Sequence, residues 1–404
     1  MEEKLAHKRI LLIFQASIGH SPRIMREISI LNSAGAAVDI VSTLPNDTHG
    51  LLGHAYRIDS FEPQDAVSAK ILSSNHPLRA LRIGSNFVRN TLRKFLSARA
   101  LLRGKSDLTE FLIENKGRYD VWWVYDSYGL NSARQAKKLL GAHAPKIVYE
   151  TQDLVPEYFF GKTMSQRRKK WERESIAVAD RMITAGDLYC EYYKEQYPKA
   201  SAAASIFVWP NYSETIVPPR MEHNKPRTFI FYGNIAHNRP ILPLIEALSL
   251  VDGDYHFTFV GDNRIGKALT SAIAEHDLGS KVSYLGQVKP SEGLELVSDF
   301  DFGVVALSGS DENERRAPAS KVGTYLAAGI GIIASDLPGI KNLLEDHSEA
   351  IFVEGVCPKK WAKAFEDAIS MSEADLNNAK VKSHELAKDL RQSVNKDSYI
   401  DVFV

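Results

Sequence analysis

The sequence of 404 residues predicts an α/β protein with two domains of similar construction. Short apolar runs alternate with amphipathic segments along the chain, a pattern typical of parallel sheets covered by helices. A proline-rich segment from Pro210 to Pro226 interrupts this alternation, which then restarts. A chain of this length accommodates two domains of ordinary size. We therefore expect a first domain over residues 1–215, a second over 216–384, and a final helix over 385–404 that can pack back on the first domain.

The first half opens with an apolar strand and a helix that carries clear end signals. Ile10–Phe14 is the predicted strand, and the turn 16–20 follows it. The next helix has Ser21 as its N-cap and Pro22 at its first position, and Gly35 closes it. The remaining predicted elements are a helix over Ser132–Leu140 and strands over Val38–Ser42, Asp120–Tyr125, Ile147–Glu150, Arg181–Ala185 and Ile206–Trp209.

The second half repeats the alternation and ends in helices. One helix is predicted over Pro240–Leu250, and the stretch from Pro358 onward is largely helical. The predicted strands cover Thr228–Tyr232, Phe257–Val260, Val282–Leu285 and Phe302–Ala306.

The segment from Pro318 to Gly339 is the most informative part of this half. It predicts a helix capped by Ser320, with Lys321 in its first turn and Gly329 at its end. The apolar run after the glycine, residues 330–334, is typical of a parallel strand covered on both faces. A lysine at a helix start beside strand ends in an open α/β sheet can hold a phosphate.

Composition places the protein among globular proteins of a reducing compartment. The net charge is zero, but residues 1–215 carry 30 basic and 23 acidic side chains while the rest carry 20 and 27. Cys190 and Cys357 lie far apart, which fits a reducing compartment better than a disulfide framework. Without a signal-peptide core or an apolar run near 18 residues, we expect a cytoplasmic location.

A basic stretch distinguishes the first domain. Between residues 70 and 105 there are nine basic residues and no acidic one, interleaved with Leu, Ile and Phe. A basic amphipathic helix of this kind suits an anionic membrane, which suggests peripheral binding at its inner face through Arg89, Arg93 and Lys94. An ordinary solvated face stays open as the alternative, whereas nucleic acid is disfavoured because no recognised binding motif accompanies the stretch.

Several other chemistries find no support. The turn around Gly19 lacks the G-x-G-x-x-G pattern, which argues against a nicotinamide cofactor. Pro156 stands where the first glycine of a P-loop before Gly161-Lys162-Thr163 would be. No zinc spacing, metalloprotease motif or kinase set is present.

Several motifs in the same order resemble those of family 4 glycosyltransferases. The segment 318–339 is similar to the family's P-x-K-x-x-E-Y-x-A-x-G-x-P-V-I-A-S-x-x-P-G, and 149–157 (Y-E-T-Q-D-L-V-P-E) to Y-D-x-H-E-L-x-P-E. Residues 21–27 resemble D-P-R-x-x-R-E, and 231–240 the family's glycine turn with its basic residue. The resemblance covers roughly residues 8–355.

This resemblance implies the GT-B fold, in which two Rossmann-like domains face one another across a cleft. It also implies a retaining, metal-independent hexosyltransferase-like enzyme without a resident cofactor, which uses a UDP- or GDP-linked sugar and a glycan or lipid-linked acceptor in surface polysaccharide or glycoconjugate synthesis. The implied donor-binding residues are Gly19, Gly233, Asn234, Arg239, Asp262, Gln287, Val288, Arg316, Lys321 and Thr324. The implied catalytic candidates are Gln152, Asp153, Arg239 and Lys321.

The sequence departs from the family at four positions. Arg316 and Thr324 stand where the family has glutamates, and Gln152 and Tyr125 where it often has histidines. These departures leave two alternatives open: a non-catalytic relative that acts as a partner or carbohydrate-binding subunit, and a sugar-nucleotide epimerase. The epimerase would need titrating groups that the matching positions lack. The sequence leaves open whether the protein forms an oligomer.

Overall fold

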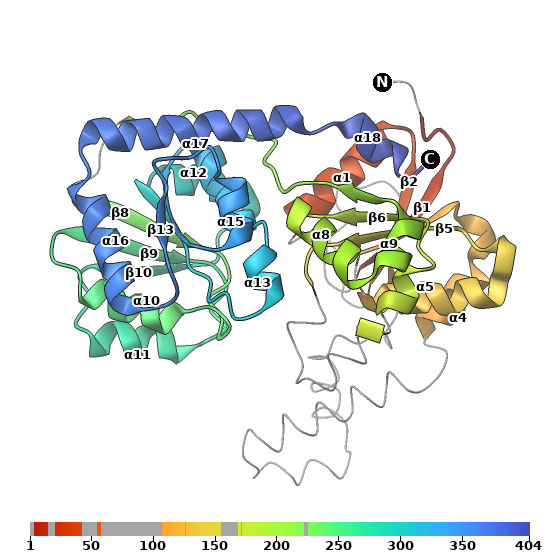
Figure 1. Cartoon of the computed structure of the whole chain (residues 1–404), viewed down its shortest axis with the longest axis horizontal. Coiled ribbons are helices and arrows are strands. Elements are labelled where there is room, and N and C mark those ends of the chain that lie inside the picture. The colour runs from red at the N-terminus through yellow and green to blue at the C-terminus, as the bar shows by residue number, and fades with distance from the viewer. Residues whose placement is uncertain are drawn as a thin grey trace, which may run out of the picture.

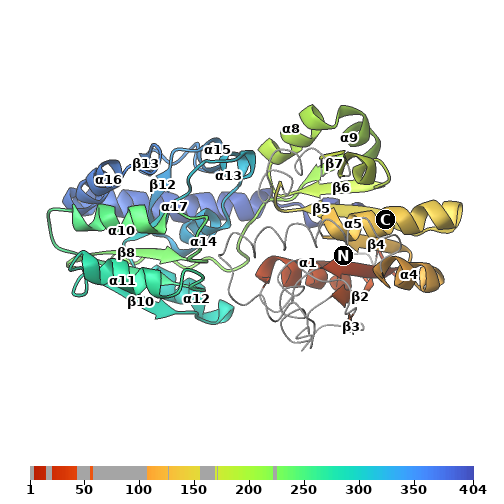
Figure 2. The same ribbon diagram turned by 90° about the horizontal axis from the view of Figure 1, so that it is seen from below.

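The computed structural model describes residues 4–14, 21–42, 55–57, 107–125, 127–154, 169–170, 172–221 and 225–404. Two α/β domains lie side by side, each built on a parallel sheet with helices on both faces (Figure 1; Figure 2). The first sheet has seven strands in the order β3-β2-β1-β4-β5-β6-β7, and the second has six in the order β10-β9-β8-β11-β12-β13.

The first sheet is built from short, mostly apolar strands. The inner strand β1 pairs in parallel with β2 and β4, so that Ile10 lies opposite Val38 and Val121. The strands are β1 (Arg9–Phe14), β2 (Ala37–Ser42), β3 (Ala55–Arg57), β4 (Val121–Val124), β5 (Lys146–Thr151), β6 (Arg181–Thr184) and β7 (Ile206–Val208). The helices are α1 (Pro22–Ser33), α4 (Asp107–Glu114), α5 (Ser127–Leu140), α8 (Asp187–Gln196) and α9 (Pro198–Ala204), with 3-10 turns at Lys116–Arg118 and Gly141–His143.

The second sheet and its helices follow the linker. The strands are β8 (Arg227–Tyr232), β9 (Tyr255–Val260), β10 (Val282–Gly286), β11 (Phe302–Val305), β12 (Gly331–Ser335) and β13 (Ile351–Val353). The helices are α10 (Ile241–Ser249), α11 (Lys267–Glu275), α12 (Pro290–Ser298), α13 (Glu312–Arg316), α14 (Ser320–Ala328), α15 (Pro338–Leu343), α16 (Pro358–Ser370), α17 (Glu373–Ser393) and α18 (Lys396–Asp401).

Each sheet separates two apolar layers. In the first domain, α4, α5, α8 and α9 pack on one face, while α1 and α18 pack on the other. In the second domain, α10, α11 and α16 cover one face, and α12, α14 and α15 cover the other. Strands buried on both faces explain why their sequences read as continuous apolar runs.

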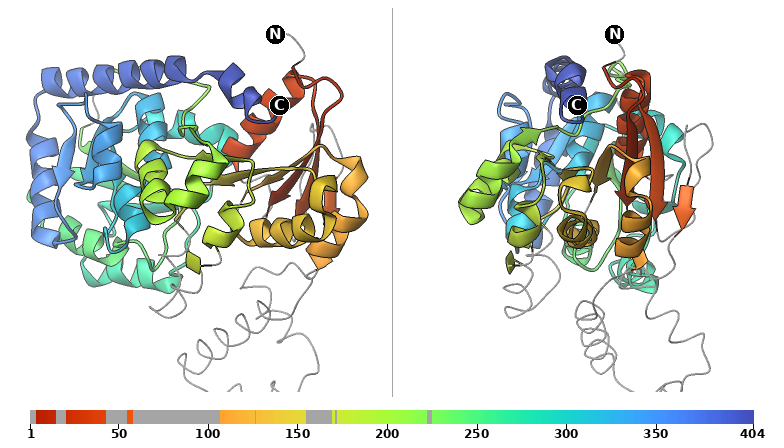
Figure 3. Two further views of the ribbon diagram at one scale, coloured as in Figure 1. Left: turned by 45° about the vertical axis from the view of Figure 1, so that its right-hand side comes forward. Right: turned by 90° about the vertical axis from the view of Figure 1, so that its right-hand side faces the viewer.

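The chain crosses between the domains twice. The linker after β7 makes the first crossing, and α17 runs along the second domain and leads to α18, which lies beside α1 in the first domain (Figure 1; Figure 3). Tyr399 of α18 stacks on Trp209 of the linker, with 4.4 Å between ring centroids. Phe403 meets Trp123 of β4 edge to face at 5.5 Å. The end of the chain therefore completes the core of the first domain.

The predicted helices and strands are present, with two corrections, whereas the predicted turn 16–20 lies outside the described residues. Ser320 is the first residue of α14 and does not cap it, because the N-cap position falls on Ala319, which follows Pro318 and has no side-chain acceptor. The predicted helix 385–404 is the end of α17 followed by the separate helix α18. The break occurs because Val394 and Asn395 are extended, and Asn395 caps α18 by accepting a bond from the amide of Ser398.

No helix in the described part of the chain is both long enough and apolar enough to cross a membrane.

Candidate functional site

The loops at the carboxyl ends of the second sheet's strands bring several predicted residues together. Gly233 and Asn234 follow β8, Asp262 follows β9, and Gln287 and Val288 follow β10. In parallel sheets, ligands bind at this edge. Gly19, Arg89, Arg93 and Lys94, with the basic stretch 70–105, lie outside the described residues.

Gly233 has a backbone conformation that favours glycine, and the Lys321 side chain lies close to it. Its φ is 135°, and a Cβ at this position would lie 2.6 Å from Cε of Lys321. The lysine stem therefore crosses directly over the glycine turn. Any larger residue would clash with the stem and would also have to adopt a strained backbone.

Lys321 is a partly buried cation in the first turn of α14. Its Nζ lies 3.4 Å from the centroid of the Phe231 ring, a cation–π contact. Burial, and then the charge of Arg239, hold the pKa of this ammonium well below its usual value. Among the described residues, no carboxylate forms an ion pair with Lys321. An anion placed here would therefore be stabilised by two neighbouring cations.

Arg239 lies in the turn before α10 and pairs with a buried carboxylate. Its Nη1 donates to Oε1 of Glu314 at 3.0 Å, and the side chains are 28% and 3% exposed. Glu314 also accepts bonds from the hydroxyl of Ser308 at 2.5 Å and the amide of Ser310 at 3.4 Å. Both members of the pair line a cavity of about 480 Å³.

Thr324 lies one turn beyond Lys321 and bonds to its own helix. Its hydroxyl donates to the carbonyl of Ser320 at 3.3 Å. The acidic residues that the sequence places nearby are engaged elsewhere, since Asp311 caps α13 and Glu312 pairs with Arg316. The structure thus gives Thr324 no carboxylate substitute among these residues.

Arg316 points toward the first domain. Its guanidinium donates to the carbonyl of Leu188 and to Glu195, both at 3.3 Å. Leu188 and Arg316 also line a cavity of about 380 Å³ between the domains. The structure therefore places this arginine in the domain interface, apart from the pair formed by Lys321 and Arg239.

The remaining predicted donor-binding residues lie on the loops that follow β9 and β10. Asp262 accepts a bond from Nε of Arg264 at 2.7 Å. Gln287 is exposed, whereas Val288 packs on the apolar layer under α14. Both follow Gly286, whose carbonyl accepts a bond from the amide of Gly261 at 2.8 Å.

In the first domain, the two predicted candidates after β5 face different partners. Gln152 donates from Nε2 to the hydroxyl of Tyr125 at 2.5 Å. Asp153 accepts a bond from Nδ2 of Asn313 at 3.1 Å, so it meets the second domain. Neither residue pairs with the other.

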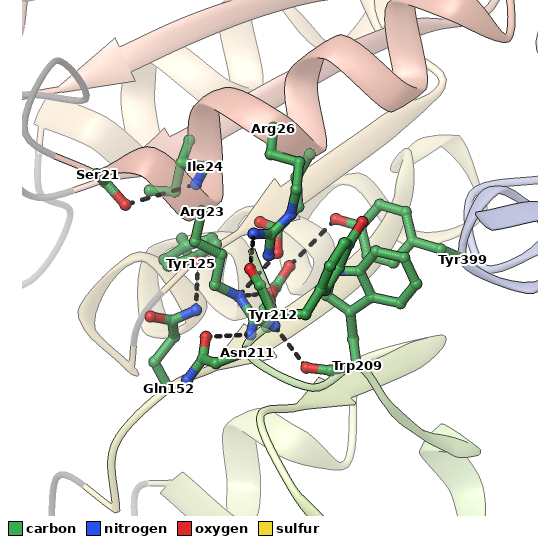
Figure 4. A network of polar contacts seen from close by, with 12 residues as sticks. Ser21, Arg23, Ile24, Arg26, Tyr125, Gln152, Trp209, Asn211, Tyr212 and Tyr399 are labelled. Carbon is green, nitrogen blue, oxygen red and sulfur yellow. Dashed lines mark hydrogen bonds and ion pairs between the residues drawn. The ribbon is translucent and has the colours of Figure 1, made fainter. Parts of the chain in front are cut away.

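A network of buried charged residues surrounds Arg23 in the first domain (Figure 4). Arg23 of α1 pairs with Glu27 at 2.7 Å and with Glu150 of β5 at 2.8 Å. It also donates to the linker, at Oδ1 of Asn211 (2.7 Å) and the carbonyl of Trp209 (2.9 Å). Burial, and then the nearby Glu150, raise the pKa of Glu27 well above its usual value. The network ties α1 and β5 to the first interdomain crossing.

Sequence reasoning missed the partners that complete these sites. The spacing of Arg23 and Glu27 is typical of a pair on one helix face. Glu150, however, lies 127 residues away from Arg23, and no local pattern connects them. Asn313 stands in a polar run without a motif, so only the structure shows its contacts with the first domain.

Comparison with known proteins supports this description. Residues 226–371 match the family model described as Glycosyl transferases group 1. A search of curated proteins gives no match.

Several solved structures share the fold over nearly the whole chain. Anabaena HepE in complex with UDP has 13% identity and a TM-score of 0.64, covering 98% of this chain and 97% of that one. Sucrose-phosphate synthase from Thermosynechococcus elongatus has 16% identity and a TM-score of 0.63, covering 95% of each chain. A glycosyltransferase from Rickettsia africae has 14% identity and a TM-score of 0.64, covering 98% of each chain.

At these identities the likeness concerns the fold, and it confirms the predicted GT-B architecture. The chain therefore has the GT-B fold, and its second domain resembles the group 1 glycosyl transferases, with membership of family 4 in particular left as a prediction.

Proposed function

We propose that the protein transfers a sugar from a nucleotide-diphosphate sugar to an acceptor. The observation that carries this proposal is Lys321, a partly buried cation without a carboxylate partner among the described residues, beside Arg239 at the carboxyl edge of the second sheet. Lys321 and Arg239 are adjacent cations, and Lys321 has no acidic partner among the described residues. Such a pair suits the negative charges of a diphosphate. They would also stabilise the leaving group as the bond to the sugar breaks.

The neighbouring cavity suits the sugar end of such a donor. It measures about 480 Å³ and includes polar groups of Ser308, Ser310 and Asp311 beside Arg239. Hydroxyl and carboxylate oxygens can bind sugar hydroxyls. HepE and the trehalose-6-phosphate protein from E. coli were solved with UDP-glucose and UDP-2-fluoro glucose, respectively, which makes UDP-linked donors the first to test.

The finer parts of the proposal follow from the family resemblance. They are a UDP- or GDP-linked donor, retention at the anomeric carbon, no required metal, and a glycan or lipid-linked acceptor in polysaccharide or glycoconjugate synthesis. They also include a cytoplasmic location with peripheral binding at the inner membrane face, supported by the basic composition of residues 70–105. Gln152 and Asp153 lie after β5, where they could contact an acceptor or the donor sugar.

A non-catalytic carbohydrate-binding role is the second candidate. The position of Arg316 favours it, because this side chain pairs with Glu195 of the first domain where the family has a donor-binding glutamate. An active enzyme would bind a nucleotide sugar and turn it over, whereas a carbohydrate-binding subunit would show no turnover.

Calorimetry against UDP, GDP, UMP and their sugar conjugates tests the proposal. A diphosphate should bind more tightly than the monophosphate of the same base, because only the diphosphate can use both cations. Any nucleotide sugar that binds is then assayed for hydrolysis and for transfer to lipid-linked and free glycans, with and without a chelator. Binding without turnover on any acceptor would favour the second candidate, and absence of nucleotide binding would refute the proposed sugar transfer.

A further inference from the structure

The side chain of Tyr325 joins β8 to β11 at the point where the pairing of these two strands ends. The last ladder pair that the structure describes between them connects Ile230 and Gly303. Beyond this pair, the amide of Tyr232 donates to the Tyr325 hydroxyl at 3.0 Å, and that hydroxyl lies 3.2 Å from the carbonyl oxygen of Val304. One side chain of α14 therefore connects the carboxyl ends of both strands.

This position requires a group that both accepts and donates a hydrogen bond. The Tyr325 hydroxyl accepts from Tyr232, and it can donate its single proton to the carbonyl of Val304 or, at 3.4 Å, to that of Ile230. Tyr325 is fully buried, and burial raises the pKa of its hydroxyl, so the proton stays on the oxygen at neutral pH. Phenylalanine would fill the same space but would leave the buried amide of Tyr232 without this partner.

The ring of Tyr325 also sets how closely α14 approaches the sheet. Gly303 of β11 lies against the ring, and a Cβ at this glycine would collide with it. On its other sides the ring belongs to the apolar layer that α14 forms with β8, β11 and β12. Because protein interiors are closely packed, the ring has little room to move, and the helix stays at a fixed depth.

Lys321 lies one helical turn before Tyr325, so both side chains extend from the same face of α14. Tyr325 reaches β8 at Tyr232, and Lys321 reaches it at Phe231, where Nζ lies 3.4 Å from the ring centroid. The order of the strands reverses between β8 and β11, and ligands of open parallel sheets bind at such a reversal. A shift of α14 against β8 would therefore move the Lys321 ammonium within the proposed anion site.

We propose that Tyr325 is a positioning residue, which fixes Lys321 for anion binding by joining the ends of β8 and β11. Its hydroxyl holds the end of β8, and its ring sets the depth of α14. Together these contacts keep Lys321 over Phe231. Tyr325 acts through Lys321, since it is fully buried and exposes no atom to a substrate. The inference rests on the proposed function only in taking a nucleotide diphosphate as the anion.

Tyr325→Phe tests this role because it removes the hydroxyl and keeps the ring. Hydrogen–deuterium exchange at the amide of Tyr232 should become about tenfold faster, the equivalent of a hydrogen bond of roughly 1.4 kcal/mol. The pH dependence of Lys321 acylation, followed by mass spectrometry, reports on the ammonium itself. Burial, and then the charge of Arg239, hold the pKa of Lys321 well below its usual value, so a lysine released from Phe231 should acylate with a midpoint at higher pH. An unchanged midpoint would overturn the proposal.

Tyr255→Phe is the matched control for the loss of a buried hydroxyl. Tyr255 is also buried and donates to the carbonyl of Leu248 at 2.6 Å, but it lies at the start of β9, at the opposite edge of the sheet. This variant should leave the Lys321 midpoint unchanged. An equal shift in Tyr255→Phe and Tyr325→Phe would reveal a general loss of stability and would count against a positioning role.

Gly303→Ala gives a second test in which the Tyr325 hydroxyl is retained. The added Cβ displaces the ring, so the Lys321 midpoint should again move to higher pH. A folded Gly303→Ala protein with the parent's midpoint would contradict the role given to the ring. If this variant does not fold, the two phenylalanine variants still decide the matter.

Nucleotide binding separates this inference from the proposed function. If UDP binds the parent in calorimetry, Tyr325→Phe should weaken that binding about three- to tenfold, the net value of one hydrogen bond, and Tyr255→Phe should not. Affinity equal to the parent's in Tyr325→Phe overturns the link to anion binding. If neither UDP nor GDP binds the parent, the proposed function fails, and the acylation midpoints alone decide whether Tyr325 positions Lys321.

Discussion

Lys321 approaches Phe231 with its Nζ 3.4 Å from the ring centroid, and its stem covers Gly233 between them. The ring face stabilises the cation, and among the described residues no carboxylate pairs with it. The Lys321 ammonium therefore lies at the strand ends, where it contacts β8 through Phe231 and the following turn through Gly233.

Replacing either cation should weaken nucleotide binding. Lys321→Ala and Arg239→Ala are each expected to cost about 1.5–3 kcal/mol of UDP or GDP binding, the range for hydrogen bonds to charged groups. Calorimetry measures the loss. Lys359→Ala, an exposed lysine on α16, is the matched control and should bind as the parent does. If both variants keep the parent's affinity, the diphosphate does not bind here.

Gly233→Ala should damage both stability and binding. The added Cβ would lie 2.6 Å from the Lys321 stem at a φ of 135°, so the lysine has to move and the backbone is strained. We expect a loss of about 1–3 kcal/mol in the free energy of unfolding, typical of residues forced into rare backbone regions. Urea unfolding checks this, with Gly279→Ala as control because nothing lies within 4 Å of that position. Equal urea midpoints for Gly233→Ala and Gly279→Ala would contradict the structural role given to Gly233.

Thr324→Glu should tighten binding of nucleoside diphosphates. The Thr324 hydroxyl donates to Ser320 and has short reach, whereas a carboxylate can accept bonds from both ribose hydroxyls. Comparison of UDP with its 2′-deoxy analogue shows whether any gain comes from the ribose. Affinity that stays the same or falls would place the ribose away from α14.

The fold could be predicted from local patterns because each pattern has a local cause. Ser21 accepts a bond from the amide of Ile24, and Gly329 ends α14 at a φ of 63°, as their positions in the sequence suggest. The prediction that Ser320 caps α14 is wrong, because a serine near a helix start can occupy the first turn instead of the N-cap.

The candidate site was only partly predictable because its pairings join distant segments. Lys321 and Arg239 are predicted from their motifs, and the structure brings them near one another. Glu314 as the partner of Arg239, and Asn313 as the partner of Leu154 across 159 residues, depend on how loops and domains pack. A run of charged residues such as 311–316 indicates a helix start but does not specify which charges meet.

Glu27 should make stability depend on pH. Its pKa is raised above the usual 4.5 in the folded protein by burial and by Glu150, so the folded state keeps a proton that the unfolded chain loses. Its contribution to stability therefore falls as the pH rises above about 4.5 toward the folded-state pKa. Glu27→Gln cannot lose this proton, and its stability relative to the parent should increase between pH 5 and 8. Thermal midpoints across this range test it, with Glu110→Gln on the exposed face of α4 as control; a constant difference between Glu27→Gln and the parent would contradict the prediction.

The basic stretch 70–105 should bind an anionic membrane. Its nine basic residues have no acidic neighbour within the stretch, and each basic residue near an anionic surface contributes about 1 kcal/mol. Phe87, Leu92 and Phe95 would add insertion of apolar side chains. Since surface charges are screened within about 8–10 Å at physiological ionic strength, binding should fade in high salt.

Liposome co-sedimentation tests this docking. The protein should sediment with vesicles containing anionic lipid and not with neutral ones, and changing Arg89, Arg93 and Lys94 to Glu should release it. Changing Lys359, Lys360 and Lys363, three exposed lysines of α16, to Glu gives the same change in net charge and should leave sedimentation intact. Equal sedimentation with both kinds of vesicle, or with neither, would leave the stretch as a solvated face or a protein interface. A lipid-linked acceptor would then have to reach the cleft without help from the first domain's charge.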